Sequence, residues 1–130
     1  MANELILIIE DDPSSRKLLR DTLQVAGYET IESPTAEMGL SLAEERRPAL
    51  ILMDIRLPGM SGVEALGQLR RDPAMRSVAV IAVTASVSGP QSDLMKAGFD
   101  GLETKPVSIV GLLRKIRTAL DHRPSAAATP

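Results

Sequence analysis

Three short segments of the chain are apolar without a polar break: "LILII" (5–9), "ALILM" (49–53) and "VAVIAV" (78–83). A continuous apolar run of this length, rich in β-branched residues, is typical of a parallel strand that is buried on both faces. Two weaker segments, 29–32 and 101–104, complete the set. We therefore expect a parallel sheet of five strands.

Segments with helical periodicity separate these strands, and glycine or proline residues mark where most of them end. The expected helices cover residues 13–26, 35–45, 61–71, 90–97 and 107–120. Strands that alternate with helices through short connections predict an α/β fold of the (βα)₅ type. Its crossovers should be right-handed, with helices on both faces of one parallel sheet.

The length of the chain fits one domain, which we expect to cover residues 1–121. A chain of 130 residues can bury enough surface for a single core, so no second domain is needed. Residues 122–130 contain small residues, two prolines and no apolar periodicity. We expect this segment to be a disordered C-terminal tail.

Composition excludes several classes of protein. The chain has no cysteine, which rules out disulfides and thiolate metal sites and favours a reducing cytoplasm. The opening apolar run is too short for a signal peptide or a membrane span, so we expect a soluble protein. The net charge of −2 and the single Tyr and Phe offer neither a basic surface nor a stacking platform. Direct binding of nucleic acid is therefore not expected.

Polar residues follow the predicted strands where those strands end. Asp54 comes directly after the apolar run 50–53, and "EDD" (10–12) follows the first strand. Thr84 ends the fourth strand and Lys105 follows the fifth. In open α/β sheets, ligands bind outside the carboxyl ends of the strands. We therefore expect these side chains to converge on one site around Asp54.

The acids of this site predict a magnesium ion. Two carboxylates about 4 Å apart repel by roughly 4 kcal/mol at an effective dielectric of 20, so Asp11 and Asp54 together favour a bound cation. Oxygen ligands suit Mg²⁺, which keeps several of its waters. Asp12 precedes Pro13 and is expected to cap the following helix. This leaves Asp11 as a direct ligand and Glu10 as a contributor through water.

Thr84 and Lys105 fit a phosphoryl group at the same site. If the strand order is 2-1-3-4-5, the fourth strand lies about 4.8 Å from the third and the fifth about 10 Å away. A short hydroxyl then reaches the site from near, and a long ammonium side chain from far. Together with a magnesium ion they can orient phosphoryl oxygens, with the Asp54 carboxylate as the nucleophile.

Four motifs together resemble the receiver domain of two-component response regulators: "IIEDDPSSR" (8–16), "LILMDIRLPGMSG" (50–62), "VIAVTAS" (80–86) and "TKP" (104–106). The resemblance covers residues 4–120 and, within the family, is closest to the DivK-like single-domain regulators. It implies a doubly wound, flavodoxin-like (CheY-like) sheet of order 2-1-3-4-5. An aspartate-nucleophile phosphatase of the haloacid dehalogenase type is disfavoured, because its second Asp would stand at Arg56.

The resemblance also implies residue roles and partners. Asp54 would accept the phosphoryl group, and Thr84 and Lys105 would bind its oxygens. The Mg²⁺ ligands would be Asp11, Asp54, the backbone carbonyl of Arg56 and, through water, Glu10. A sensor histidine kinase or histidine phosphotransfer protein would be the donor. A target protein would read the face built from the fourth helix, the fifth strand and the fifth helix, and a homodimer is possible.

One position departs from the family pattern and keeps an alternative open. Leu102 stands three residues before the lysine, where the family usually has Tyr or Phe. The resemblance implies a signalling protein rather than an enzyme, although it would assist its own phosphoryl transfer and dephosphorylation. The alternative is a non-phosphorylated receiver that acts as a docking or dimerisation module. The presence of Asp54, Thr84 and Lys105 argues against that alternative.

Overall fold

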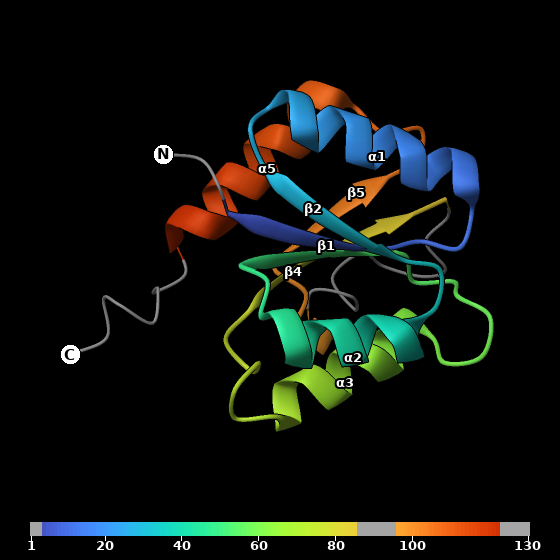
Figure 1. Ribbon diagram of the computed structural model, residues 1–130, viewed down its shortest axis with the longest axis vertical. Helices are drawn as coiled ribbons and strands as arrows, with labels where there is room; N and C mark the ends of the chain where they lie inside the picture. Colours follow the sequence, from blue (N-terminus) through green and yellow to red (C-terminus); the bar gives the residue numbers. More distant parts are fainter. Residues whose placement is uncertain (1–3, 86–95, 123–130) are drawn as a thin grey trace.

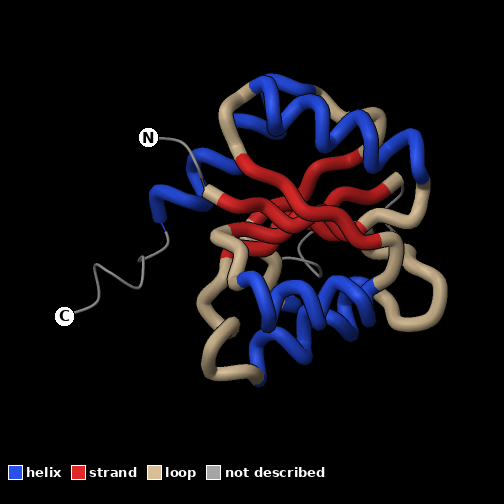
Figure 2. The backbone as a smooth tube through the Cα atoms, in the orientation of Figure 1, coloured by secondary structure: helices blue, strands red, loops and turns tan. Residues whose placement is uncertain are grey.

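A computed structural model describes residues 4–85 and 96–122 and places five parallel strands between two layers of helices (Figures 1 and 2). The strands are β1 (Leu5–Ile9), β2 (Glu29–Ser33), β3 (Leu50–Met53), β4 (Ala79–Thr84) and β5 (Gly101–Thr104). Their order in the sheet is β2-β1-β3-β4-β5. This confirms the doubly wound fold and the strand order that the family resemblance implied.

The helices of the described residues are α1 (Pro13–Val25), α2 (Ala36–Arg46), α3 (Gly62–Arg71) and α5 (Ile109–His122). Helices α1 and α5 cover one face of the sheet, and α2 and α3 cover the other (Figure 1). The last turn of α5 includes His122, which the sequence pattern assigned to the tail. Most of the helix expected at 90–97, and the tail from residue 123, lie outside the described residues. None of the helices in the described part of the chain has the length and apolar character that crossing a bilayer requires.

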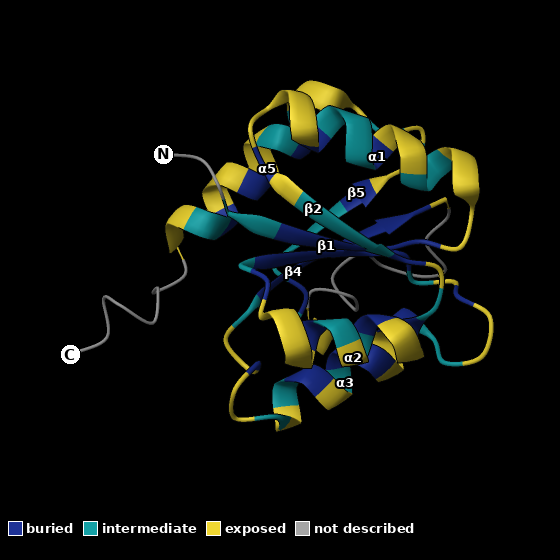
Figure 3. Cartoon of the chain, in the orientation of Figure 1, coloured by how far each residue is buried: buried dark blue, intermediate teal, exposed yellow. Residues whose placement is uncertain are grey.

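Alternate residues of each central strand supply two cores, one on each face of the sheet. Leu7 and Ile9 of β1 pack in the cluster under α2 and α3, whereas Ile6 and Ile8 pack in the cluster under α1 and α5. Burial is therefore concentrated in the sheet (Figure 3). All four residues of β3 are fully buried, and each contributes about 1.5–3 kcal/mol. This strand is a firmly held support for the residue that follows it, Asp54.

Side-chain caps define where the helices begin. The Asp12 carboxylate accepts a hydrogen bond from the Ser15 amide (2.8 Å), as its position before Pro13 predicted. This bond lowers the pKa of Asp12 below its ordinary value. In α3, Ser61 and Glu64 form a reciprocal capping box. Asp12 thus caps α1, and it is not one of the three acids that meet at the sheet.

Arg47, at the end of α2, has a left-handed backbone (φ 51°, ψ 64°), which a residue with a Cβ adopts at a cost of about 1–2 kcal/mol. We expect Arg47→Gly to raise the free energy of unfolding by roughly 0.5–1 kcal/mol, since glycine removes the strain but adds unfolded-state entropy. Urea unfolding followed by circular dichroism measures this. The control is Glu44→Gly inside the same helix, which should destabilise by up to about 1 kcal/mol. Equal effects of the two changes would contradict the explanation.

Candidate functional site

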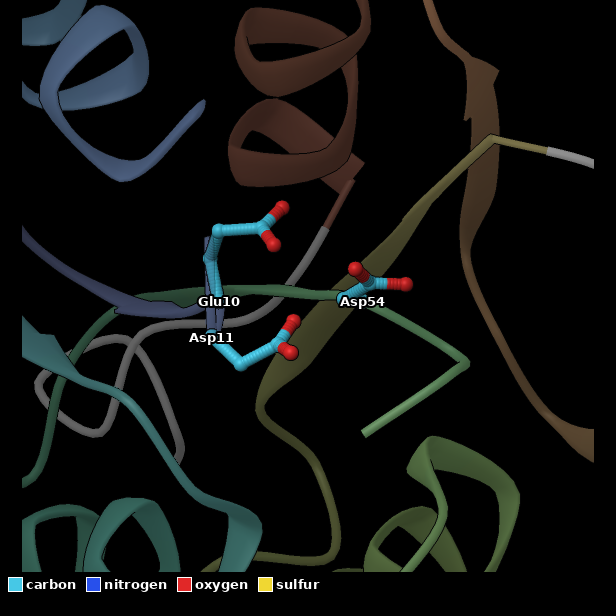
Figure 4. A group of neighbouring side chains, drawn as sticks. All are labelled: Glu10, Asp11 and Asp54. Carbon is cyan, nitrogen blue, oxygen red and sulfur yellow. The ribbon is translucent and has the colours of Figure 1, made fainter. Parts of the chain in front are cut away.

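Three carboxylates meet at the carboxyl ends of β1 and β3. Glu10 and Asp11 follow β1, Asp54 follows β3, and the three side chains project into a common space (Figure 4). One carboxylate oxygen from each lies within 4.8 Å of the others. Glu10 and Asp54 are only 1% and 6% exposed, whereas Asp11 is open to solvent. The arrangement joins two buried charges to one that an incoming ion can reach.

The register of the sheet explains why these acids meet. Ile9, the last residue of β1, pairs with Met53, the last residue of β3, so the next residues of both strands emerge together. The Asp54 amide donates to the Ile9 carbonyl (3.0 Å), which extends the pairing into the site. The strand order brings Asp11 and Asp54 together as the sequence predicted.

Lys105 reaches the acid cluster from β5. Its ammonium lies 2.7 Å from Glu10 Oε1 and 3.4 Å from Asp54 Oδ2. Its backbone amide donates to the Thr84 carbonyl (2.8 Å). This bond holds the first residue after β5 against the end of β4. The sequence predicted that Lys105 approaches Asp54, but not that its shorter contact is with Glu10.

Burial and charge shift the pKa values of this pair in directions that can be assigned. Burial raises the pKa of Glu10, and the hydrogen bonds from Lys105 and the Asp12 amide offset only part of that rise. Burial lowers the pKa of Lys105, but its hydrogen bond to Glu10 and the charges of Asp54 and Glu10 raise the pKa above its ordinary value. Lys105 is therefore a permanent cation at neutral pH. Both Glu10 oxygens have partners, which suits an indirect rather than a direct contact with a metal ion.

Thr84 and Arg56 are the remaining residues that the sequence assigned to the site. Thr84 is fully buried at the end of β4, in register with Thr104 of β5. Arg56 contributes its backbone amide, which donates to Asp54 Oδ1 (3.0 Å) and so orients the carboxylate. The sequence singled out Arg56 for its carbonyl and did not predict this amide contact.

Arg16 is a site residue that sequence reasoning missed. Its guanidinium donates to the Glu10 carbonyl (2.8 Å) and lies 3.5 Å from the Glu32 carboxylate on β2. It therefore fixes the backbone that carries the acid pair. A cation in the first turn of a helix is electrostatically unfavourable, so its place in α1 was the available signal.

Gly62, the first residue of α3, shapes the loop after Asp54. Its amide donates to the Ile55 carbonyl (2.9 Å). A Cβ added at Gly62 would lie 2.5 Å from the Asp54 carbonyl oxygen and 2.9 Å from Ile55 Cα. The first residue of α3 must therefore be a glycine for the loop to pass so closely.

A groove beside the acids runs between α1 and the segment that follows β5. It is lined by Ser15, Leu18, Leu19, Lys105, Pro106 and Val107. Leu18 is 46% exposed, so an apolar side chain on α1 faces outward next to the site. Lys105 lines this groove and also contacts Glu10 and Asp54, so the groove lies directly next to the acid cluster.

Comparisons with known proteins agree with this geometry. A family model for the response regulator receiver domain matches residues 6–117. The polar-differentiation response regulator DivK of Brucella anthropi is 39% identical over 116 residues, which is 88% of this chain and 94% of the relative. DivK of Brucella ovis is 38% identical with the same coverage.

Solved structures of other proteins have the same fold as this chain. The chemotaxis protein CheY4 of Vibrio cholerae is 26% identical, with a TM-score of 0.83 over 91% of this chain and 99% of its own. The receiver domain of the sensor histidine kinase PA1611 of Pseudomonas aeruginosa is 29% identical, with a TM-score of 0.85 over 92% and 99%. That structure holds a magnesium ion coordinated in its active-site cleft.

Proposed function

The chain belongs to the response regulator receiver family of two-component systems, and we propose that it accepts a phosphoryl group on Asp54 and signals through protein binding. The observation that carries this proposal is the meeting of Glu10, Asp11 and Asp54 with the Lys105 ammonium at one edge of a CheY-like sheet. The protein would be a regulator of other proteins in the cytoplasm rather than an enzyme that turns over a separate substrate.

The donor set fits a magnesium ion. Asp11, Asp54 and the Arg56 carbonyl would hold it directly, with Glu10 acting through water, and all of these are oxygen ligands. Asp11 is exposed and so can receive a hydrated ion. When bound, Mg²⁺ would neutralise charge on the phosphoryl oxygens during transfer.

The residues of this chain would share the transfer as follows. One carboxylate oxygen of Asp54 attacks phosphorus. The Arg56 amide donates to the other oxygen, Oδ1, and so holds the carboxylate in its orientation. A phosphorus–oxygen bond forms as the phosphorus–nitrogen bond of a donor phosphohistidine breaks. The donor nitrogen keeps the electron pair and takes a proton from solvent. Lys105 and Thr84 bind the phosphoryl oxygens.

We propose partners from the family and from the surfaces around the site. A histidine kinase or phosphotransfer protein would place its phosphohistidine over Asp54 and its apolar side chains in the groove beside Leu18 and Val107. The output face would include β5 and α5. Its third element, the helix expected at 90–97, lies mostly outside the described residues. Leu102 on β5 packs against the cluster under α2 and α3. We propose that Leu102 packs differently in the two signalling states, in place of the aromatic side chain that is usual in the family.

Phosphorylation by acetyl phosphate tests the proposed function. We expect the intact mass of the protein to increase by one phosphoryl group when Mg²⁺ is present, and not when the metal is chelated. A phosphotransfer profile against histidine kinases of the same cell would then identify the donor. A protein that takes no label from acetyl phosphate, while folded and loaded with Mg²⁺, supports the alternative of a docking or dimerisation module.

Magnesium should stabilise the protein, because the acids meet only in the folded chain. At a free Mg²⁺ concentration of 100 times the dissociation constant, the gain is about 2.7 kcal/mol. Thermal unfolding with and without Mg²⁺ measures the gain. Asp11→Asn should remove most of it. Asp12→Asn should keep it, because that side chain caps α1 and asparagine caps equally well. The proposed ligands are wrong if the two variants respond alike.

A further inference from the structure

Glu103 is a buried carboxylate that the proposed chemistry does not use. It lies on β5, in register with Val83 of the cluster under α1 and α5, and is 5% exposed. Both of its oxygens have partners: Oε1 lies 2.5 Å from the Lys115 ammonium, and Oε2 accepts a hydrogen bond from the Ser108 amide (3.1 Å). Such partners offset part of the desolvation free energy of a buried carboxylate, but not necessarily all of it. A role beyond packing would explain why a strand residue is charged here.

The bond to Ser108 completes the start of α5. Ser108 Oγ accepts from the Gly111 amide (3.2 Å), as the first half of a capping box does. In α3 the second half comes from within the helix, where Glu64 accepts from the Ser61 amide. The equivalent residue in α5 is Gly111, which has no side chain. Glu103, on the strand before the helix, supplies the missing acceptor.

This bond also closes the short segment that carries Lys105. At one end the Lys105 amide is held by the Thr84 carbonyl (2.8 Å), and at the other the Ser108 amide is held by Glu103. Between these two points the described contacts of the segment are the Lys105 ammonium itself and the packing of Val107 on the cluster under α1 and α5. The Lys105 ammonium spans Glu10 and Asp54, so a shift of this segment moves the ammonium relative to the acceptor oxygen.

We propose that Glu103 is a positioning residue for phosphoryl transfer, which holds the segment 104–108 closed and so keeps Lys105 aimed at Asp54. The inference rests on the proposed function of Asp54 as acceptor. Lys115 neutralises the Glu103 carboxylate from the solvent side, where its own side chain is 44% exposed. The proposed Mg²⁺ ligands follow β1 and β3, and a displaced Lys105 would withdraw positive charge from them, so loss of the Glu103 contacts should slow transfer without weakening the affinity for magnesium.

Two substitutions at Glu103 distinguish the effect of its hydrogen bond to Ser108 from the effect of its negative charge. Glu103→Ala removes both contacts, and we expect the rate of phosphorylation by acetyl phosphate at saturating Mg²⁺ to fall roughly tenfold, as expected for a misplaced reacting group. Glu103→Gln keeps an oxygen that can accept from Ser108 and should retain most of the rate. The Mg²⁺ dissociation constant, measured by calorimetry, should be no larger for either variant than for the wild type.

Asp100 provides a matched control. Its Oδ2 accepts from the Val80 amide (2.8 Å) and lies 3.2 Å from the Arg70 guanidinium, so it too joins a backbone amide to a cation. It precedes β5, whereas Lys105 follows β5, so the two residues lie at opposite ends of the same strand. Asp100→Ala should lower the melting temperature but leave the rate of phosphorylation unchanged.

Each outcome decides the inference. A wild-type rate for Glu103→Ala, an equal loss for Asp100→Ala, or a parallel loss of Mg²⁺ affinity would overturn the positioning role. If Glu103→Ala does not fold, Glu103→Leu fills the same space without an acceptor and should show the same slow transfer. Failure of the wild type itself to take a phosphoryl group would contradict the proposed function instead, and would be seen before any variant is compared.

Discussion

Asp54→Asn should abolish covalent phosphorylation by acetyl phosphate while leaving the domain folded. The amide has nearly the shape of the carboxylate, and its oxygen can still accept the hydrogen bond from the Arg56 amide. It lacks the anionic oxygen that attacks phosphorus. Intact-protein mass spectrometry measures the label, and circular dichroism checks the fold.

The charge of Asp54 also affects stability in a predictable direction. Without a metal ion, Asp54 adds a third carboxylate to Glu10 and Asp11, and one ammonium cannot offset all of them. Asp54→Asn should therefore be at least as stable as the wild type in chelator. The control for labelling is Asp12→Asn, which keeps the acceptor and should be phosphorylated normally. If Asp54→Asn still changes its affinity for a partner when a phosphodonor is added, as the wild type would, Asp54 is not the switch.

Gly62→Ala should have the second large effect, on both stability and phosphorylation. The new methyl group would lie 2.5 Å from the Asp54 carbonyl oxygen, so either the loop after β3 or the start of α3 must move. Forcing an extra group into a packed site costs about 1–3 kcal/mol. A displacement of Asp54 by about 1 Å can slow transfer by as much as roughly a hundredfold. Urea unfolding and the rate with acetyl phosphate measure the two effects.

Gly67→Ala is the matched control in the same helix. A Cβ at Gly67 would meet nothing within 4 Å, and the residue lies in the middle of α3. Alanine there should stabilise the protein by about 0.5–1 kcal/mol and leave phosphorylation unchanged. Destabilisation by Gly67→Ala, or normal phosphorylation of Gly62→Ala, would show that the close approach at Gly62 is not what places Asp54.

Much of the fold could be read from the sequence because strong local signals agreed. The apolar run before Asp54 predicted a central strand, and all four residues of that strand are buried. Asp12 before Pro13 predicted a helix cap, and Asp12 caps α1. The order of the strands is different in kind. It depends on which crossovers pass over which face, and no local pattern encodes that, so the order came from the family resemblance.

The site was predicted in its members but not in its contacts. The sequence indicated that Glu10 and Lys105 approach Asp54, yet their own short contact depends on side-chain packing across residues far apart in the chain. The role of Arg16 was also missed. The contact of Arg16 and the close approach at Gly62 both depend on how near separate elements lie, which a linear pattern does not contain.

The pairing of Lys105 with two acids has a consequence for the order of events at the site. Three carboxylates face one ammonium, so with all three ionised the acids exceed the ammonium by two negative charges, which a single divalent ion would cancel. A phosphodonor is itself an anion and would be repelled by the metal-free pocket. The domain should therefore become receptive only after it is electroneutral, with magnesium binding ahead of the donor.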